Sequence, residues 1–302
     1  MNTLIVGGTG LIGGHAALHL RFLGHTVSIS GRTQPQAPSP LADFPFIQGN
    51  YLNADITIDQ LSAFDTVVFT AGADLRHIPA AEKDHDAFFL HANGEAVPAF
   101  AALARDAGIA QFIHIGSYYW HAEPSLVDTN IYMRSRKLES EGIVALARPG
   151  FAATSLCPPF LVGDISPTAA SPFAGELVQY FQGKLALAES APPGGVAFLT
   201  LRSLSQAIAG AIANREAVSG KVLAIGDENL TWAQFNYFRR ALGLSEVELP
   251  LVEDHPLVPK AARIGGNKNV FLDTTLEAQG LLGNYARNDV YNAVYEVVAN
   301  RI

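Results

Sequence analysis

The sequence has little of what covalent and metal cross-links require. Its 302 residues include a single cysteine, Cys157, so an internal disulfide and a cluster of thiolate metal ligands are both excluded. Cys157 lies in the apolar run ATSLCPPFLV, and this setting favours a buried strand residue over a reactive thiol. So low a cysteine content fits a reducing compartment.

Long apolar runs and clusters of basic residues are also missing. No apolar run reaches the roughly 18 residues that a membrane span needs, and Met1 leads into NTLIVGG without a basic stretch, so we expect no signal peptide and a cytoplasmic protein. The formal net charge of −8, without a Lys/Arg cluster, argues against nucleic acid or anionic membrane as partners. A small-molecule substrate is the expected partner, and a homodimer stays open.

The spacing of histidines and other reactive residues excludes several kinds of catalytic site. His15 and His19 stand four residues apart in a helical stretch, but no third ligand accompanies them, so we interpret them as a solvated helix face and expect no metal. The sequence has no G-x-S-x-G nucleophile elbow and no P-loop lysine.

The first half of the sequence alternates between short strand-like runs and stretches with the hydrophobic period of a helix. Between its strand-like runs lie helical stretches, 11–24 and 86–108, the second continuing for about six turns. This order predicts an α/β fold with a doubly wound parallel sheet. The six predicted strands are short runs rich in β-branched residues that end in Gly, Ser, Asn or Pro: 3–8, 25–31, 45–50, 65–72, 111–117 and 152–158.

The second half is more irregular. Pro and Gly become denser after about residue 160, and short segments follow. We therefore predict a nucleotide-binding domain over 1–160 and a smaller substrate lobe over 161–302, partly interleaved with the sheet. Strands are predicted at VAFLTL and KVLAIG, and helices at SLSQAIAGAIAN, TWAQFNYFRRALG and DVYNAVYEVV.

The run GGTGLIGG carries a glycine pattern that is typical of dinucleotide sites. Gly7, Gly10 and Gly13 follow the first strand directly and open the first helix, which is the setting a Rossmann sheet requires. Glycine permits a tight turn and close approach to a pyrophosphate, which the N–H groups of the helix N-terminus then bind. The residues of this turn predicted to contact the cofactor are Gly7, Thr9, Gly10, Leu11, Ile12 and Gly13.

The end of the second strand bears on the choice of cofactor. A carboxylate there accepts from the ribose hydroxyls of NAD, whereas an arginine accommodates the 2′-phosphate of NADP. The strand ends in Ser30, Gly31 and Arg32, without a carboxylate. We therefore predict NADP rather than NAD, with Arg32 along the phosphate and the adenine.

With these features the chain resembles the extended short-chain dehydrogenase/reductase family, which includes nucleotide-sugar epimerases and dihydroflavonol-type reductases. The resemblance covers nearly the whole sequence. It rests on GGTGLIGG, FTAGA, HANGEAV, FIHIGS, the pair Tyr132 and Ser135, and CPPFLVG.

The resemblance implies roles for particular residues. Ser117 matches the serine that hydrogen-bonds the reacting carbonyl, and Tyr132 the tyrosine that exchanges its proton. The family's lysine four residues after the tyrosine is replaced by Arg136, and Lys137 follows it. Residues that match the cofactor-lining positions of the family are Thr70, Ala71, Gly72, Asn93 and Pro158.

The chemistry needs a cation near the tyrosine, because a free tyrosine has a pKa near 10 and exchanges its proton poorly at neutral pH. Three hypotheses stay open. Arg136 stands in for the lysine; or a one-residue π-bulge in the helix brings Lys137 round to the face of Tyr132; or the site binds cofactor without chemistry.

Two variable segments flank the expected nicotinamide pocket, and they supply aromatic and basic side chains for lining it. These side chains are Arg76, His77 and His85 in the first segment and Tyr118, Tyr119, Trp120 and His121 in the second.

Together these features predict an NADP-dependent oxidoreductase that interconverts a carbonyl and an alcohol on a small or medium organic substrate. One alternative is a nucleotide-sugar epimerase or dehydratase with bound NAD(P). For its diphosphate we see no obvious basic pair in the second lobe, where Arg202, Arg239 and Arg240 are the candidates. The other alternative is a catalytically silent NADP-binding regulator.

Overall fold

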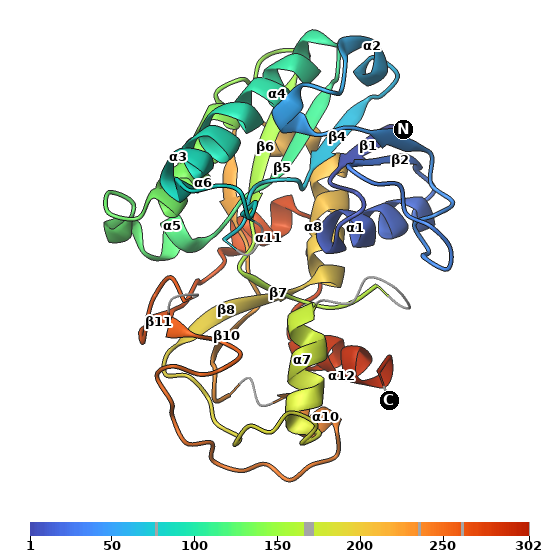
Figure 1. Cartoon of the computed structure of the whole chain (residues 1–302). Coiled ribbons are helices and arrows are strands. Elements are labelled where there is room, and N and C mark those ends of the chain that lie inside the picture. Colours follow the sequence, from blue (N-terminus) through green and yellow to red (C-terminus); the bar gives the residue numbers. More distant parts are fainter. Residues whose placement is uncertain (76–77, 166–171, 235–236, 261–262, 302) are drawn as a thin grey trace.

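The computed structural model describes residues 1–75, 78–165, 172–234, 237–260 and 263–301. The chain forms a larger body around a seven-stranded sheet and a smaller body below it in Figure 1, with the amino terminus in the larger body and the carboxyl terminus in the smaller. All strand pairs of the large sheet are parallel.

The order of strands in the large sheet is β3-β2-β1-β4-β5-β6-β9. The predicted doubly wound sheet and its six strands are confirmed, and the order reverses between β1 and β4, where open sheets of this kind bind ligands. The strands are β1 (Asn2–Val6), β2 (Thr26–Gly31), β3 (Phe46–Gln48), β4 (Thr66–Phe69), β5 (Gln111–Ile115), β6 (Ala152–Cys157) and β9 (Val222–Ala224).

Helices cover both faces of this sheet (Figure 1). The central strands β1, β4, β5 and β6 are buried because apolar residues of the helices pack against each face, which explains their largely apolar sequences. One face carries α1 (Leu11–Phe22), α8 (Leu201–Ala213), α9 (Arg215–Val218) and α11 (Leu276–Leu281). The other carries α2 (Ile58–Leu61), α3 (His85–Phe89), α4 (Ala96–Asp106) and α6 (Ile131–Val144).

The predicted six-turn helix over 86–108 is not uniform. Residues 90–95 between α3 and α4 form a π-helix, η2 (Leu90–Glu95), which packs closely on α6. Short helical segments also occur at η1 (Tyr51–Asn53), α5 (Tyr119–Ala122) and η3 (Pro124–Leu126).

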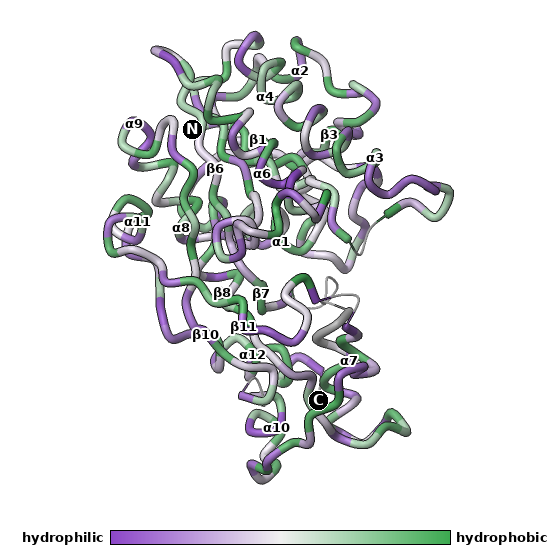
Figure 2. The backbone as a smooth tube through the Cα atoms, turned by 90° about the vertical axis from the view of Figure 1, so that its left-hand side faces the viewer, coloured by the Kyte–Doolittle hydropathy of each residue, from purple (hydrophilic) through white to green (hydrophobic). Residues whose placement is uncertain are grey.

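The smaller body is built on a mixed sheet around β8 (Gly195–Thr200). This strand is hydrophobic along most of its length in Figure 2 and is wholly buried. It pairs in parallel with β7 (Phe160–Val162) and β11 (Asn269–Val270), and antiparallel with β10 (Glu228–Thr231). Helices α7 (Pro172–Phe181), α10 (Tyr237–Ala241) and α12 (Val290–Ala299) complete this body.

The second half returns to the large sheet, because β9, which lies within KVLAIG, extends it beside β6, and α8 packs on α1. Two predictions for the second half need correction. VAFLTL includes Leu201, which already begins α8. TWAQFNYFRRALG was predicted as one helix, whereas Thr231 ends β10 and α10 begins only at Tyr237. The antiparallel pairing of β10 with β8 outweighs local helical propensity there.

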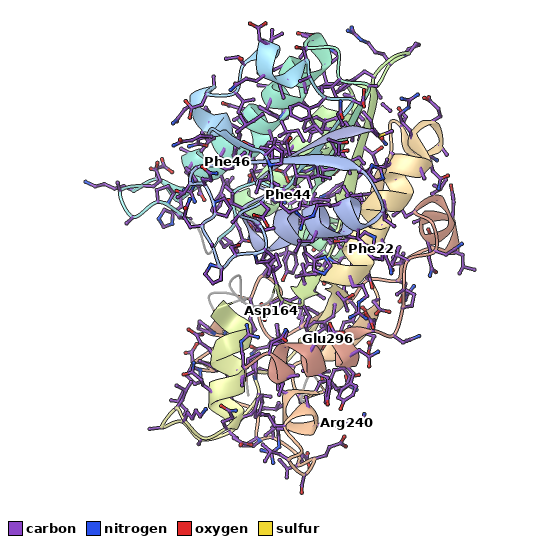
Figure 3. The ribbon with its side chains drawn as sticks, turned by 90° about the vertical axis from the view of Figure 1, so that its right-hand side faces the viewer. Phe22, Phe44, Phe46, Asp164, Arg240 and Glu296 are labelled. Atoms are coloured by element: carbon purple, nitrogen blue, oxygen red, sulfur yellow. The ribbon has the colours of Figure 1, made fainter. Side chains whose placement is uncertain are left out.

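Ion pairs join the segments that connect the two bodies. Asp164, which follows β7 at the junction in Figure 3, accepts a hydrogen bond of 2.7 Å from Arg301 after α12. Arg202 in α8 forms ion pairs with Asp289, which precedes α12, and with Glu296 within α12. These contacts tie α12 to both α8 and β7.

Among the described residues, no helix combines the length and the apolar character that crossing a membrane requires.

Candidate functional site

The glycine turn between β1 and α1 lies against the end of β4. Gly7 has a φ of +83°, and a Cβ there would lie 2.7 Å from the Thr70 hydroxyl. A Cβ on Gly13 would lie 2.4 Å from the Gly7 carbonyl oxygen. Thr70 itself donates to the Val6 carbonyl oxygen at 2.9 Å, which ties β4 to β1. Glycine at both positions is therefore required for the close packing of the turn.

This turn fits the pyrophosphate of a dinucleotide. Gly10 is the N-cap of α1 and provides no side-chain cap, so the first N–H groups of the helix, from Leu11 onward, have no partner within the helix. Thr9 is half-buried, and its hydroxyl would lie 2.6 Å from a Cβ on Gly31 at the end of β2. Unpaired N–H groups at a helix N-terminus favour an anion.

The end of β2 presents Arg32 to solvent. Its side chain is exposed, while its carbonyl oxygen accepts from the Gln48 amide at 3.3 Å. The backbone after β2 is thereby tied to β3, and the guanidinium extends from a fixed position at the side of the glycine turn.

Asn93 joins the loop after β4 to α6. Its amide oxygen accepts from the Ala73 N–H at 2.8 Å, and its amide nitrogen donates to the Ala73 carbonyl at 3.1 Å and to the Ser135 hydroxyl at 3.3 Å. Asn93 is fully buried within the π-helix η2. It thereby fixes the stretch of Thr70, Ala71 and Gly72 that the family resemblance assigns to the cofactor.

Ser117 and Pro158 lie on neighbouring strand ends. Ser117 follows β5 and is buried, and Pro158 follows β6. The Pro158 carbonyl accepts from the Tyr118 N–H at 3.2 Å, which joins the two loops. Both residues thus stand at the carboxyl edge of the sheet, facing the smaller body into which β6 leads through β7.

Helix α6 carries Tyr132 on its buried face. Tyr132 is 7% exposed, and its ring packs edge-on against Phe89 with ring centroids 5.1 Å apart. Ser135 and Arg136 lie on the same face, and the helix is α-helical from Ile131 to Val144. The hypothesis of a π-bulge in this helix is therefore wrong: the π-helix is the neighbouring segment 90–95.

Lys137 points away from the tyrosine. Its side chain is 39% exposed and lies 3.6 Å from Glu141 one turn on. A regular α-helix places the fifth residue after Tyr132 well off its face. Arg136, one turn from Tyr132, is the cation that this helix brings to the sheet edge.

Arg136 is enclosed between α6 and the ends of β4 and β5. It is 6% exposed, and its Nη2 donates to the Ile115 carbonyl at 3.2 Å and its Nη1 to the Ala73 carbonyl at 3.4 Å. Its Nε lies 2.8 Å from Oε1 of Glu139, which is fully buried. A Cβ on Gly72 would lie 2.5 Å from Nη1, so the guanidinium occupies space that only glycine leaves free.

Burial and charge act on Tyr132 in opposite directions. Burial raises the pKa of its hydroxyl above the usual value of about 10, because the phenolate loses its hydration. The Arg136 cation lowers this pKa, while the carboxylates of Asp74 and Glu139 raise it. The net effect is a raised pKa and a neutral phenol.

Sequence reasoning missed Glu139 and His114. Both side chains are fully buried, and His114 Nε2 lies 3.5 Å from Glu139 Oε1. The available signal was the helical spacing, since Glu139 follows Arg136 by three residues and Tyr132 by seven. His114 lies in the apolar strand β5, and nothing in its sequence neighbourhood marks it.

The two flanking segments are only partly described, since Arg76 and His77 lie outside the described residues. Tyr118 is fully buried and donates to the Val270 carbonyl at 3.0 Å, so it joins the loop to β11. Trp120 stacks on His121 with ring centroids 3.6 Å apart, and burial lowers the pKa of His121 to about 4. His85 begins α3 and is exposed.

The prediction of a solvated face for His15 and His19 is wrong for His15. Its Nδ1 lies 2.8 Å from the Ser205 hydroxyl of α8, and burial, with smaller effects of His19 and Arg202, lowers its pKa to about 4. The two histidines line a cavity of about 470 Å³ together with Leu18, Pro40, Asp164, Ile165, Arg202 and Gln206. Within the described ranges no group of three side chains could hold a metal ion.

Cys157 is fully buried at the end of β6, as predicted, and burial raises the pKa of its thiol to about 11. The three arginines considered for a diphosphate have partners of their own. Arg202 pairs with Asp289 and Glu296, Arg239 with Glu189, and the Arg240 guanidinium lies 4.4 Å from the centroid of the Tyr291 ring.

Comparison with known families and structures agrees with this arrangement. The sequence model of the NAD dependent epimerase/dehydratase family matches residues 3–167, more than half of the chain. No protein of curated function matches the sequence significantly.

Solved structures resemble the fold over its whole length. UDP-N-acetylglucosamine 4-epimerase from Bacillus cereus is 17% identical with a TM-score of 0.74, and the match covers 100% of this chain and 96% of that one. UDP-glucuronic acid 4-epimerase from Bacillus cereus, solved with UDP-glucuronic acid and NAD, is 16% identical with a TM-score of 0.74 and 100% coverage of both chains. UDP-glucose-4-epimerase from Stenotrophomonas maltophila, solved with NAD and formylated UDP-arabinopyranose, is 18% identical with a TM-score of 0.74, covering 99% and 97%. At such identities the likeness establishes the fold.

Proposed function

Because the chain belongs to the NAD dependent epimerase/dehydratase family, we propose that it is an enzyme that transfers a hydride between a nicotinamide dinucleotide and the carbon of an alcohol or carbonyl group. The observation that carries the proposal is the position of Ser117 and Tyr132. Both lie at the carboxyl edge of the sheet, with Arg136 one helical turn from the tyrosine. The glycine turn that fits a pyrophosphate lies at the same edge.

The residues have distinct roles in this reaction. When bound, the dinucleotide supplies or accepts the hydride. In the reducing direction, Ser117 would donate a hydrogen bond to the carbonyl oxygen and Tyr132 would pass its hydroxyl proton to that oxygen as the carbon gains the hydride. The phenolate left on Tyr132 would be stabilised by the Arg136 cation, and a proton from solvent would restore the phenol.

The neutral phenol of Tyr132 can donate the proton that reduction of a carbonyl consumes. Its pKa is raised above the usual value by burial, so the proton that reduction consumes is present throughout the neutral range. Oxidation would need the phenolate and would gain rate as the pH rises.

For the cofactor we keep the proposal of NADP. Arg32 stands exposed at the end of β2, in a stretch of Ser30, Gly31 and Thr33 that has no carboxylate for the ribose hydroxyls. Two of the three similar structures described above were solved with NAD, which is a property of those proteins. Titration of the protein with NADH and NADPH separates the two cofactors.

A second candidate function is epimerisation or dehydration of a nucleotide sugar. It is favoured by the whole-length likeness to UDP-sugar epimerases. An epimerase returns the hydride to the substrate, so it would convert a UDP-sugar without net change in nicotinamide absorbance. A ketoreductase would consume one NAD(P)H for each carbonyl reduced.

The test of the proposed function is Tyr132→Phe. The substitution removes the proton donor while keeping the ring against Phe89, so we expect turnover to fall by about 100-fold or more and dinucleotide affinity to stay within about twofold. Turnover is measured on a panel of carbonyl compounds and UDP-sugars, and affinity by quenching of protein fluorescence.

Tyr295→Phe is the matched control, because Tyr295 is exposed on α12 and far from the sheet edge in sequence and structure. It should leave both quantities unchanged. Equal turnover in Tyr132→Phe and the wild type would refute the assignment of the tyrosine. Dinucleotide binding without turnover on any compound would instead support a catalytically silent regulator.

A further inference from the structure

The ion pair of Arg136 and Glu139 is the most deeply buried pair of opposite charges at the sheet edge described above. Glu139 is fully buried, and Arg136 is 6% exposed. Charges that lose their hydration are costly unless they are paired and held in good geometry. A pair kept at this depth, one turn from Tyr132, calls for an explanation beyond stability.

Two hydrogen bonds and one ion pair hold the guanidinium, and the contact of Nε with Glu139 is an ion pair without a hydrogen bond. Nε lies 2.8 Å from Glu139 Oε1, Nη1 donates to Ala73 and Nη2 to Ile115. Because a guanidinium is planar and its donors form a rigid fork, these contacts set both its position and its plane. Each Nη nitrogen carries two N–H groups and uses one of them, so one on each is left for a ligand or for Tyr132.

Glycine at position 72 is what gives the guanidinium its space. A Cβ there would lie 2.5 Å from Nη1 and 3.6 Å from the Asn93 amide oxygen. The need for glycine is steric, because Gly72 is not among the glycines with positive φ. A lysine at position 136 ends in a compact ammonium without this fork and would not fill the same space.

Polar side chains lie beneath Glu139, although neither of its carboxylate oxygens accepts a hydrogen bond from the described residues. Its Oε1 lies 3.5 Å from His114 Nε2, and His114 Nδ1 lies 2.9 Å from the Ser155 hydroxyl. Ser155 donates to the Ser140 hydroxyl at 3.0 Å, and Ser140 donates to the Arg136 carbonyl at 3.0 Å. These bonds join His114, below the carboxylate, to the backbone of Arg136 on the helix that carries the cation.

We propose that Glu139 and Gly72 are positioning residues that let an arginine serve where the family resemblance leads one to expect a lysine. Glu139 holds the Arg136 guanidinium and Gly72 leaves room for it, so that its remaining N–H groups serve Tyr132 and the nicotinamide ribose. This inference rests on the proposed function and adds to it the residues that make the arginine usable.

A double-mutant cycle of Gly72→Ala and Arg136→Lys tests the part of Gly72. With arginine present, the added methyl displaces Nη1, so Gly72→Ala should weaken NADPH binding and lower turnover by about tenfold or more. In the Arg136→Lys background the methyl meets no guanidinium, and Gly72→Ala should change both by less than about twofold. Equal effects in the two backgrounds would overturn the role of Gly72.

Gly280→Ala is the control for the added methyl, since a Cβ at that position in α11 meets nothing within 4 Å. It should be neutral in both backgrounds. Circular dichroism and thermal unfolding of all variants exclude loss of the fold as the cause.

Two variants test the role of Glu139, one that removes only its charge and one that removes its side chain. Glu139→Gln keeps an amide oxygen for Arg136 and removes the negative charge that raises the pKa of Tyr132, so the pH profile of alcohol oxidation should shift to lower pH. Glu139→Ala releases the guanidinium and should lower turnover by about tenfold or more. A purely structural role would lower activity without shifting the profile, and an unshifted profile in a folded Glu139→Gln variant would overturn the proposal.

The outcome also separates this inference from the function on which it rests. Wild-type protein that binds neither NADH nor NADPH refutes both. Wild-type protein that binds and turns over, with an additive cycle and an unshifted profile, refutes the positioning role alone.

Discussion

The periodicity of helix α6 determines which of two adjacent cations, Arg136 or Lys137, lies on the same face as Tyr132. Ser135, Arg136 and Glu139 fall on the same stripe of α6 as Tyr132 because they follow it by three, four and seven residues. Lys137 is rotated off this stripe and remains half-exposed. The sequence alone could offer Arg136 and Lys137 as alternatives. Arg136 could be chosen only once the structure showed that the helix is regular and that this face is buried.

Arg32 allows a direct test of cofactor choice at the scale of one residue. Arg32→Asp replaces a cation near the expected 2′-phosphate with a carboxylate, so we expect the affinity for NADPH to fall by about tenfold or more while that for NADH falls less or rises. Fluorescence titration with both cofactors measures the change in preference. Gln34→Asp, two residues on at another exposed position of the same loop, controls for the added negative charge. An unchanged NADPH/NADH ratio in Arg32→Asp would refute the role of Arg32.

At the scale of elements, the π-helix η2 places Asn93 where it clamps two other segments. Its amide occupies both backbone groups of Ala73 after β4 and also bonds Ser135 of α6. An α-helix across 90–95 would rotate Asn93 relative to α4, since each π turn adds a residue. The loop after β4, with Gly72 in it, therefore depends on an irregular turn in a neighbouring helix.

Removal of this clamp has a predictable cost. Asn93→Ala leaves the N–H of Ala73 without its partner in a half-buried setting and removes the bond to Ser135, while the Ala73 carbonyl keeps Arg136. The free energy of unfolding should therefore fall by about 1 to 3 kcal/mol. Chemical denaturation measures it. Asn300→Ala, at the exposed end of α12, should change stability by no more than about 0.5 kcal/mol. If Asn93→Ala lowers the free energy of unfolding no more than Asn300→Ala does, the Asn93 amide does not contribute to stability.

The sequence predicts features that depend on short runs of residues, and it does not predict those that depend on contacts between distant segments. The six strands and the glycine turn are local, because period and glycine spacing lie within short runs, and the structure confirms them. The pairing of Glu139 with Arg136 and His114 depends on where β5 lies beneath α6. The place of β9 beside β6 is set by a crossover and not by its composition. The π-helix has no marker in the sequence 90–95.

At the scale of the whole molecule, the contact of α1 with α8 joins residues far apart in the chain. Ala16, Ala17 and Leu20 are buried in the same apolar core as Leu204 and Ala207 of α8. His15 and Ser205 meet beside this core at 2.8 Å. The stability of the larger body is therefore linked to the protonation of a histidine on its side.

His15 makes stability fall in acid. Its pKa of about 4 in the folded chain is below its ordinary value of 6.5, so the unfolded chain takes up the proton first as the pH falls. The stabilisation is fully present above about pH 6.5 and is lost toward pH 4; it amounts to on the order of 1 to 3 kcal/mol. His15→Gln, which cannot be protonated, should flatten this part of the profile of thermal unfolding against pH. His91→Gln, at an exposed position, should follow the wild type. A wild-type slope in His15→Gln would contradict the prediction.

The return of the chain to the first body through α8 and β9 sets the order in which the protein can be completed during synthesis. A nascent chain that ends near residue 160 has its glycine turn and most of its sheet, but the apolar side of α1 lacks α8 and the edge of β6 lacks β9. Such a chain exposes both an apolar surface and an unpaired strand edge, which favour aggregation. The amino-terminal half alone should therefore be insoluble when expressed, and productive folding of the larger body requires α8 and β9 to have left the ribosome.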